Sequence, residues 1–580
     1  MKQHDLNAWI IPATDPHQGE YIPAHWQTRT WFSGFTGSAG MVVVTQEFAG
    51  LWTDSRYFIQ AENELKGTGI ELVKLKIPHT PEYIDWLMEK LPEGSKVGFD
   101  GKVVSAQLAR LMESRFREKG IATDASMDLP GMIWEDRPAL PGAMVFEHEE
   151  ALAGKSRWEK LAMVRDEMKA IGAGYHLLTA LDDIAWMFNL RGADVDYNPV
   201  FVSYAIITPN NSLLFVDEKK LPDNAISRLK EEGVTVKPYD AIADYLKGLS
   251  EESSILYSSG KISHYLAQAI PRHCRKIDDI SIPARLKACK NKVEAANIRK
   301  AMVKDGVALV RFFRWLEEKI GKITITEVSL DEQLGKFRKQ QQGYTGNSFS
   351  TIAGYRDHGA IVHYSATRET AYELQPEGIL LLDSGAQYPD GTTDITRTIS
   401  LGKPSGEEKR DFTLVLKGHI ELSRAVFPAG TKGFHLDVLA RKALWQDGKN
   451  YGHGTGHGVG FFLNVHEGPQ GITPNPAVNY PLQPGMVLSN EPGFYREGHY
   501  GIRTENLVMV VPLTETAFGS FLGFETLTLF PYDLNLIDSS MLSHDEKQWI
   551  NHYHQEVYEK LAPGLDEEEK KWLSHKTRAI

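Results

Sequence analysis

The hydrophobic pattern at the start of the chain alternates between short apolar runs and amphipathic segments. The apolar runs at 8–11, 41–44 and 51–53 predict strands, because each is short and is followed by polar or turn-forming residues. Two later segments, 57–65 and 81–91, repeat apolar residues at the spacing of a helix. This mixture of elements predicts an α/β unit.

A second part of the chain repeats that order of elements. A predicted helix at 157–171 precedes a strand at 175–178, an aromatic run at 186–188 and a strand pair at 204–207 and 213–216. The first part also has a strand, then a tryptophan-containing stretch, then a strand pair, although the spacings differ. The repetition suggests a diverged duplication of one α/β unit.

The C-terminal half has longer elements. Helical spacing extends over 291–320, and strand-rich segments follow at 350–401 and 486–511. From residue 537 onward the pattern is polar and helical, which predicts an extension with little chemistry of its own.

Changes in composition suggest where the domains end. A proline-rich, acidic stretch covers 129–156, and the long helical pattern begins soon after Pro283. We therefore predict three domains, at 1–152, 153–288 and 289–580. A chain of 580 residues is far too long for one hydrophobic core, which agrees with this division.

Composition limits the class of protein. The chain has 42% hydrophobic and 24% charged residues, as soluble globular proteins do, and its net charge of −12 argues against nucleic-acid binding. No apolar stretch approaches the roughly 18 residues of a membrane span, and the N-terminal residues lack the pattern of a signal peptide. Two cysteines, Cys274 and Cys289, are too few for a disulfide framework. These features predict a cytoplasmic protein that contacts neither nucleic acid nor a membrane.

The most informative segment, 378–402, predicts a hairpin around the turn Tyr-Pro-Asp-Gly at 388–391. Asp383 ends the incoming apolar run and Asp394 lies in the returning strand. Because the midpoint of the two aspartates is within about one residue of the turn centre, we expect them to lie nearly opposite each other. Two facing carboxylates repel unless a cation or a proton lies between them.

A second segment, 485–511, has the same layout. Two apolar strands flank a loop centred near Gly498, and Glu491 and Glu505 are equally distant from that centre. One pair of opposed acids could be accidental, but two pairs are difficult to explain without a metal.

The glycine-rich stretch GHGTGHGVG, at 452–460, supplies two histidines, His453 and His457. Alternating glycine weakens both helix and strand, and the spacing does not match the G-x-G-x-x-G nucleotide motif. We expect these glycines to let the backbone pass close to a metal and a substrate. Four carboxylates with one imidazole suit two hard or borderline divalent ions such as Mn²⁺, Co²⁺ or Zn²⁺.

The ordered motifs resemble those of the pita-bread metallopeptidases. They are the two aspartates, GTGHGVG followed by NVHEGP, then SNEPGFY and GIRTEN, and the chain contains neither the H-E-x-x-H nor the G-x-S-x-G hydrolase motif. The length and the two creatinase-like α/β units make the chain most similar to the long, three-domain Xaa-Pro aminopeptidases of this family. The resemblance implies α/β and α+β architecture, with two creatinase-like domains before a pita-bread catalytic domain.

The resemblance also implies roles for individual residues. The resemblance implies two divalent metal ions and favours Mn²⁺. They would be held by five ligands: Asp383, Asp394, His457, Glu491 and Glu505. Among them, Asp394 and Glu505 would bridge the ions and Glu491 would act as general base. His453 would bind the substrate and stabilise the oxyanion. The other substrate-binding residues would be His363 in GAIVHY, His466 in NVHEGP and Arg503 in GIR, the last of these near Glu505.

The implied reaction is hydrolysis of the bond between an N-terminal residue and a following proline, by a cytoplasmic homodimer. Three alternatives stay open on the sequence. Prolidase, which cuts Xaa-Pro dipeptides, uses the same ligands in a shorter chain. Methionine aminopeptidase does not need the long region before the catalytic motifs, and a metal-free binding protein of the same fold does not need five ligands.

Overall fold

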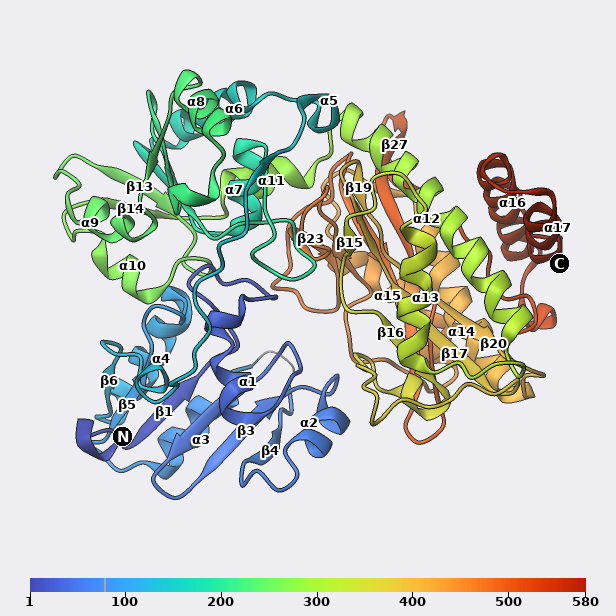
Figure 1. Ribbon diagram of the computed structural model, residues 1–580, viewed down its shortest axis with the longest axis horizontal. Coiled ribbons are helices and arrows are strands. Elements are labelled where there is room, and N and C mark those ends of the chain that lie inside the picture. Colours follow the sequence, from blue (N-terminus) through green and yellow to red (C-terminus); the bar gives the residue numbers. More distant parts are fainter. Residues whose placement is uncertain (78–79) are drawn as a thin grey trace. The chain divides into compact units, whose positions relative to one another are not determined.

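A computed structural model describes residues 1–77 and 80–580 (Figure 1). The chain forms two compact units, the first made of Met1–Glu150 with Lys155–Ala284 and the second of Ala151–Gly154 with Arg285–Ile580. Helices α5 (Glu150–Ala153) and α11 (Ile282–Ala288) contain points where the chain passes from one unit to the other. Each unit is described by itself.

The first sheet of unit 1 contains the three predicted strands, as β1, β2 and β3, and three further strands that the sequence analysis did not predict. Its order is β4-β3-β2-β1-β5-β6, in which β1 pairs antiparallel with β2 and parallel with β5. The bounds are β1 (Ala8–Ile11), β2 (Met41–Thr45), β3 (Ala49–Thr53), β4 (Glu71–Lys74), β5 (Lys96–Phe99) and β6 (Ala122–Asp124). The helices are α1 (Thr28–Ser33), α2 (Phe58–Glu64), α3 (Glu82–Lys90) and α4 (Ala106–Glu118).

Both faces of this sheet are buried, and β1 shows why its residues are all apolar. Ile10 packs in a cluster with residues of α3 and α4, such as Leu87 and Met112. Trp9 packs in another cluster with Ala61 of α2. Since successive side chains of a strand point to opposite faces, a strand covered on both sides reads as a continuous apolar run.

The second sheet of unit 1 repeats the first. Its order is β12-β11-β10-β8-β13-β14, and each neighbouring pair has the same direction as its counterpart in the first sheet. The strands are β8 (Tyr175–Leu178), β10 (Tyr204–Ile207), β11 (Ser212–Phe215), β12 (Val234–Lys237), β13 (Ser254–Tyr257) and β14 (Arg275–Asp278). This shared topology supports the suggested duplication.

The helices of the second half follow the predicted pattern. The predicted helix 157–171 is α6 (Arg157–Ile171), and the aromatic run lies in α7 (Leu181–Phe188). The remaining elements are α8 (Asp223–Glu231), α9 (Ile242–Lys247), α10 (His264–Ala269) and a two-stranded pair of β7 (Phe146–Glu147) with β9 (Leu190–Arg191).

Unit 2 holds the long helices and the curved strands. Helices α12 (Lys292–Lys319) and α13 (Glu327–Arg338) run side by side along the strands (Figure 1). Asn291 begins α12 with a reciprocal cap to Glu294, at the predicted start of this helix. The later helices are α14 (Gly406–Ser423), α15 (Gly433–Gln446), α16 (His544–Leu561) and α17 (Glu567–Lys576).

The strands of unit 2 form several small sheets and one larger sheet. The orders are β16-β17-β20, β15-β18-β19, β25-β26 and β21-β28-β27-β24-β22-β23. The first two sheets contain β15 (Gly346–Asn347), β16 (Ile352–Tyr355), β17 (Ile379–Ser384), β18 (Ala386–Tyr388), β19 (Gly391–Thr392) and β20 (Ile395–Ser400). The others contain β21 (Phe427–Pro428), β22 (Gly456–Gly458), β23 (Glu467–Ile472), β24 (Val487–Asn490), β25 (Gly493–Arg496), β26 (Tyr500–Arg503), β27 (Asn506–Thr516) and β28 (Gly519–Thr526).

The C-terminal helices belong to the core of unit 2. Val557 and Leu573 are buried in the same cluster as Phe312 of α12, and Arg397 of β20 donates a hydrogen bond to Tyr553 of α16 at 3.1 Å. The segment predicted as an extension therefore also holds the strand that follows Asp394. No helix among the described residues is long and apolar enough to cross a membrane.

Candidate metal centre

The first hairpin brings its two aspartates onto one face. Asp383, in β17, lies opposite Thr396 of β20, and Asp394 falls in the break between β19 and β20 instead of within a strand. The break coincides with a tight backbone contact, because a Cβ atom at Gly385 would lie 2.2 Å from the carbonyl oxygen of Thr393. The predicted facing pair is thus a diagonal pair, which still leaves both carboxylates on the same side of the hairpin.

The second pair of acids has the predicted register. Gly493 lies opposite Arg503 in the pair β25-β26, and Asn490 lies opposite Asn506 in the pair β24-β27. Glu491 and Glu505 occupy equivalent positions where the chain passes from one strand pair to the other. Both carboxylates therefore start from irregular backbone between two sheets, as Asp394 does.

The glycine-rich stretch contains a short strand, which the sequence did not predict. Residues 456–458 form β22, between β23 and β24. A Cβ atom at Gly456 would lie 1.9 Å from the carbonyl oxygen of Ser489, and one at Gly458 would lie 2.3 Å from that of Glu467. These glycines let neighbouring strands approach β22, and neither has the positive φ that would require glycine for another reason.

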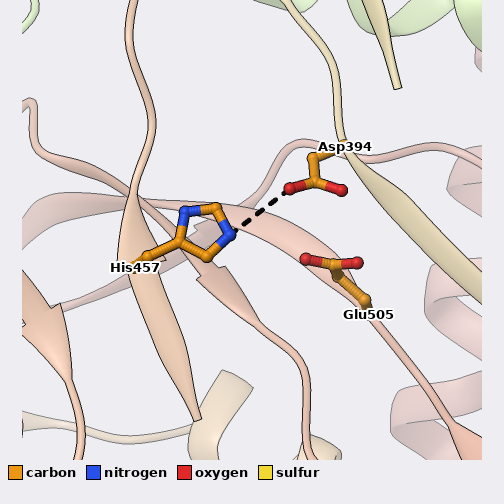
Figure 2. Close-up of side chains that lie close together, drawn as sticks. All are labelled: Asp394, His457 and Glu505. Atoms are coloured by element: carbon orange, nitrogen blue, oxygen red, sulfur yellow. Dashed lines mark ion pairs between the residues drawn. The ribbon is translucent and has the colours of Figure 1, made fainter. Parts of the chain in front are cut away.

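Three side chains from these segments converge. Asp394, His457 and Glu505 each offer a ligand atom, and these atoms lie within 4.8 Å of one another. Figure 2 shows the three groups pointing toward one another from separate segments of the chain. Nε2 of His457 lies 3.4 Å from Oδ2 of Asp394 and 3.6 Å from Oε1 of Glu491. A fourth of the five predicted ligands thus adjoins the group.

The fifth predicted ligand, Asp383, is held by an arginine. Its Oδ2 accepts a hydrogen bond from Nη2 of Arg503 at 2.6 Å. The same guanidinium donates through Nε to Thr396, whose hydroxyl donates to Oε2 of Glu505 at 2.8 Å. Arg503 is only 2% exposed, so it supports Asp383 directly and Glu505 through Thr396.

Burial raises the pKa of all four carboxyl groups. It raises the pKa of Asp394 to about 7, although the nearby His466 and Arg503 lower it, and it raises the pKa of Glu491 to about 7 against the opposing effect of His457. The pKa of Asp383 is also raised by burial, and that of Glu505 by burial together with the neighbouring acids. Asp383, Asp394 and Glu505 are buried and Glu491 is partly buried, and the grouping of these four acids opposes their simultaneous ionisation.

The donor set suits metal ions. The Gly458 carbonyl can only accept, so Nδ1 of His457 carries a proton for that 2.9 Å hydrogen bond, and in the neutral ring the lone pair is on Nε2, the atom that faces the carboxylates. Within residues 1–77 and 80–580, Oδ1 of Asp383 is buried without a hydrogen-bond partner. A lone pair close to carboxylates and a buried carboxylate oxygen without a partner are stabilised by cations or by protons, and metal ions are the cations that this donor set suits.

His453 belongs to a hydrogen-bonded chain that the sequence did not indicate. Its Nε2 lies 2.7 Å from Oη of Tyr495, and that hydroxyl accepts from Nη1 of Arg503 at 2.8 Å. Its Nδ1 lies 2.8 Å from the Gly454 carbonyl and must donate to it. With the arginine donating, the Tyr495 hydroxyl can donate to a neutral His453. The tyrosine of SNEPGFY could not be singled out from the sequence, because its contact with His453 forms only when β25 and the glycine-rich stretch meet in the folded chain.

The other predicted histidines occupy two further segments. His466, half-buried, has its ring centroid 4.2 Å from that of His457 in an edge-on arrangement. His363, also half-buried, lies in the loop after β16, next to Val362, whose carbonyl accepts from Arg503 at 3.3 Å. His466 therefore adjoins the cluster, and His363 is joined to it through its neighbour.

A buried ion pair behind the aspartate hairpin was also missed. Nε of Arg338, in α13, lies 2.9 Å from Oδ1 of Asp305, in α12. Arg338 also donates to Ser384, and Thr393 donates to Asp305. Ser384 and Thr393 directly adjoin the two aspartates of the hairpin. Nothing in the sequence distinguishes this pair from the surface charges of a helix, since only packing buries it.

The glycine stretch provides a first testable prediction. Replacing Gly456 by alanine inserts a methyl group where a backbone oxygen lies 1.9 Å away, so β22 must shift from β24. We expect a loss of about 1–3 kcal/mol in the free energy of unfolding, the usual cost of overpacking. The measurement is urea unfolding of Gly456→Ala, together with its metal content after purification.

Gly454→Ala is the matched control in the same stretch. A Cβ atom there would meet nothing nearer than the Thr473 side chain at 3.4 Å, which is ordinary contact. We expect its unfolding to differ from that of the parent protein by less than about 0.5 kcal/mol. Equal destabilisation by the two substitutions would contradict the steric explanation.

Comparison with known families assigns the chain in four consecutive parts. Residues 296–512 match the model of metallopeptidase family M24, and 520–580 match the C-terminal region of peptidase M24. Residues 1–137 and 136–294 each match a creatinase/prolidase N-terminal domain. The predicted architecture of two creatinase-like domains and a pita-bread catalytic domain is thereby confirmed.

Individual relatives are similar along almost the whole chain. A probable Xaa-Pro aminopeptidase P of Coprinopsis cinerea is 41% identical, covering 100% of this chain and 97% of its own length. One of Sordaria macrospora is 42% identical with the same coverage. The crystal structure of X-prolyl aminopeptidase from Caenorhabditis elegans, described as a cytosolic enzyme with a di-nuclear active site, is 34% identical with a TM-score of 0.95. It covers 99% of this chain and 95% of its own.

Proposed function

The chain belongs to metallopeptidase family M24, and from this membership we propose that it is an Xaa-Pro aminopeptidase, a metallopeptidase that releases an N-terminal residue preceding proline. One observation carries the proposal. The buried cluster of Asp394, His457 and Glu505 lies in a chain that matches Xaa-Pro aminopeptidases over its full length.

Two divalent metal ions would be held by five residues: Asp383, Asp394, His457, Glu491 and Glu505. When bound, such ions lower the pKa of water toward neutrality and polarise a carbonyl group. Asp394, His457 and Glu505 each offer a ligand atom within 4.8 Å of the others and would hold the ions together; of the three, the carboxylates of Asp394 and Glu505 have two oxygens each and could serve both ions. Asp394 and Glu505 are buried, at 3% and 1% exposed, whereas the His457 side chain is 22% exposed.

Glu491 is suited to accept a proton during hydrolysis. Its side chain is 18% exposed, more than those of Asp383 and Asp394, so it can face both the cluster and an entering peptide. Ser489 donates a hydrogen bond to its Oε1 at 3.2 Å, which fixes the carboxylate while leaving Oε2 available. We therefore assign Glu491 the role of general base, which passes the proton toward the leaving proline nitrogen.

His453 is suited to bind the substrate and carry a proton. In its neutral form, Nε2 accepts from Tyr495; once protonated, the ring can donate from that nitrogen to an oxyanion. Arg503 holds both Tyr495 and Asp383 and has little exposed surface, so we assign it a positioning role. His363 and His466 are proposed to contact the peptide.

Proline specificity is tested with a matched set of peptides: Xaa-Pro, Xaa-Pro-Yaa and Xaa-Ala-Yaa. We expect release of the first residue from Xaa-Pro-Yaa, and loss of most turnover when alanine replaces proline, because alanine restores an N–H and a freer φ. Chromatography of the released amino acid measures this. Cleavage confined to the dipeptide would indicate a prolidase, and equal cleavage of the alanine peptide would exclude proline specificity.

Three finer features are proposed with it. Mn²⁺ suits a site of carboxylates and one imidazole, although such ligands also accept Zn²⁺ and Co²⁺. A cytosolic location is supported by the description of the Caenorhabditis elegans enzyme, and a homodimer by the family resemblance alone. Elemental analysis, cell fractionation and sedimentation test these three features separately.

A further inference from the structure

The loop of residues 355–372, here called the His363 loop, is hydrogen-bonded to one buried carboxylate. The loop follows β16 and contains the half-buried His363. The carboxylate is that of Glu327, the first residue of α13, and Glu327 is 1% exposed. The mechanism above gives Glu327 no role.

Glu327 accepts hydrogen bonds from four residues of this loop. Its Oε1 accepts from the backbone nitrogen of Tyr355 at 2.8 Å, and its Oε2 accepts from that of Tyr372 at 2.8 Å. The Tyr364 hydroxyl donates to Oε2 at 3.0 Å, and Nδ1 of His358 lies 2.9 Å from the same oxygen. Two of these residues lie at the ends of the loop and two lie between them, so a single side chain binds both ends and the middle of the loop.

Glu327 lies in the first turn of α13. The first turn of a helix presents unpaired backbone N–H groups and a positive dipole end. Thr326, immediately before it, caps α13. Stacking reinforces the arrangement, because the ring of His358 lies 3.7 Å from that of Tyr372 and 4.4 Å from that of Tyr364, centroid to centroid.

His363 lies between two anchored neighbours. On one side, the Tyr364 hydroxyl is bound to Glu327. On the other side, the Val362 carbonyl accepts from Arg503, which also holds Asp383. The loop also packs directly on β26, since a Cβ atom at Gly501 would lie 1.6 Å from the carbonyl oxygen of Gly359. The loop is thus connected to the metal centre at Arg503 and to α13 at Glu327.

We propose that Glu327 is a positioning residue, which sets the reach of His363 toward the peptide by holding the His363 loop through Tyr364, His358 and two backbone amides. The proposal rests on the proposed function for the role of His363. The new element is Glu327, which lies outside the metal centre and on which the position of His363 depends. Within residues 1–77 and 80–580, the hydrogen bonds that the Glu327 carboxylate accepts come from the His363 loop and from none of the five candidate metal ligands. Its removal is therefore expected to alter placement and to leave the chemistry in place.

The first test removes one hydrogen bond and keeps the ring. Tyr364→Phe deletes the hydroxyl that reaches Glu327, and Tyr372→Phe deletes a hydroxyl that lies 3.3 Å from Asp357 instead. We expect kcat/KM on Xaa-Pro-Yaa to fall about 10-fold in Tyr364→Phe and less than about 2-fold in Tyr372→Phe, since small misplacement of a positioned group is costly. Both variants should keep the metal content of the parent protein. Equal activity of Tyr364→Phe and the parent contradicts the proposal.

The second test asks whether the effect passes through His363. Glu327→Gln keeps the shape and one acceptor oxygen, and Glu327→Ala removes both acceptors. We expect the glutamine variant to retain more activity than the alanine variant. In a His363→Ala background, neither Tyr364→Phe nor Glu327→Gln should reduce kcat/KM further, because the group they position is already absent. Losses that multiply in the double variants overturn the proposal and leave Glu327 a purely structural residue.

A third measurement does not depend on the substrate. Amide hydrogen exchange within 355–372 should become much faster in Tyr364→Phe and Glu327→Gln, and change less in Tyr372→Phe, which loses only the 3.3 Å hydrogen bond between Tyr372 and Asp357 within the loop. If the parent protein fails to cleave Xaa-Pro peptides, the proposed function is wrong, and exchange still decides whether Glu327 anchors the loop. Unchanged exchange in Tyr364→Phe overturns the proposal whatever the substrate proves to be.

Discussion

Hydrolysis of Xaa-Pro-Yaa peptides is expected to stop when divalent ions are removed by chelation, and to return when Mn²⁺ or a similar ion is added. The reason is the charge balance of the site. The site has four carboxyl groups, those of Asp383, Asp394, Glu491 and Glu505. One arginine, Arg503, adjoins them, and Nε2 of His457 lies beside them. Without cations the acids must take up protons, and a protonated cluster cannot supply a basic carboxylate. Full activity in exhaustively dialysed, metal-free protein would overturn the assignment.

Chelation should also lower the thermal midpoint of unfolding, because a ligand bound only by the native state stabilises it. At a free concentration of 100 times Kd the contribution is about 2.7 kcal/mol. Differential scanning calorimetry of the loaded and chelated protein measures the difference. Reloading the same sample with Mn²⁺ is the control, since it must restore the midpoint.

The size of that difference should depend on pH. In the metal-free protein, the pKa values of Asp394 and Glu491 are raised to about 7, above those of the unfolded chain. The folded apo protein therefore binds more protons than the unfolded chain, so its stability falls as pH rises from about 4 to 7. Metal binding also releases protons and weakens in acid. The gap between the loaded and metal-free midpoints should thus narrow as pH is lowered from 7 to 5.

His457→Ala and His453→Ala are expected to fail in different ways. His457 presents a lone pair toward Asp394 and Glu491, so its loss should lower metal content and activity together. His453 bonds to Tyr495 and is not in the cluster, so its variant should keep its metal and lose about 100- to 1,000-fold in kcat, as when an oxyanion donor is removed. Elemental analysis with steady-state kinetics separates the two outcomes.

His499→Ala is the control for both variants, since His499 is exposed in the loop between β25 and β26. It should keep both metal and kcat. Equal loss of metal from the His453 and His457 variants would show that the division of roles between them is wrong. Restoration of His457→Ala by excess Mn²⁺ would support a weakened site.

Local sequence determined those elements that carry their own signal. The run at 8–11 reads as a strand whichever sheet contains it, and Asn291 with Glu294 begins α12 by a contact over three residues. Symmetry about a turn also predicted that Glu491 and Glu505 share a register position, since the pairing of a hairpin is fixed by its loop. The two pairs of acids were found from their symmetry about a turn, and the motifs shared with a known family identified all five candidate ligands.

Contacts between distant segments were decided only by the tertiary structure. The break at Asp394 depends on the approach of the Thr393 carbonyl to Gly385, and the strand at 456–458 depends on neighbours that exclude any Cβ atom. Neither follows from propensity, because glycine is locally a poor strand former and becomes necessary only when two backbones meet.

The supporting groups could not be found from the sequence for the same reason. Glu327 begins a helix and Asp305 lies inside one, positions at which acids are usually solvated. Tyr495 is one aromatic residue among many. Folding buries Glu327 beneath a loop some thirty to forty-five residues away and pairs Asp305 with Arg338 across two helices. The sequence thus determined which groups can perform the chemistry, whereas burial and long-range hydrogen bonds, which exist only in the folded chain, decided how those groups are held.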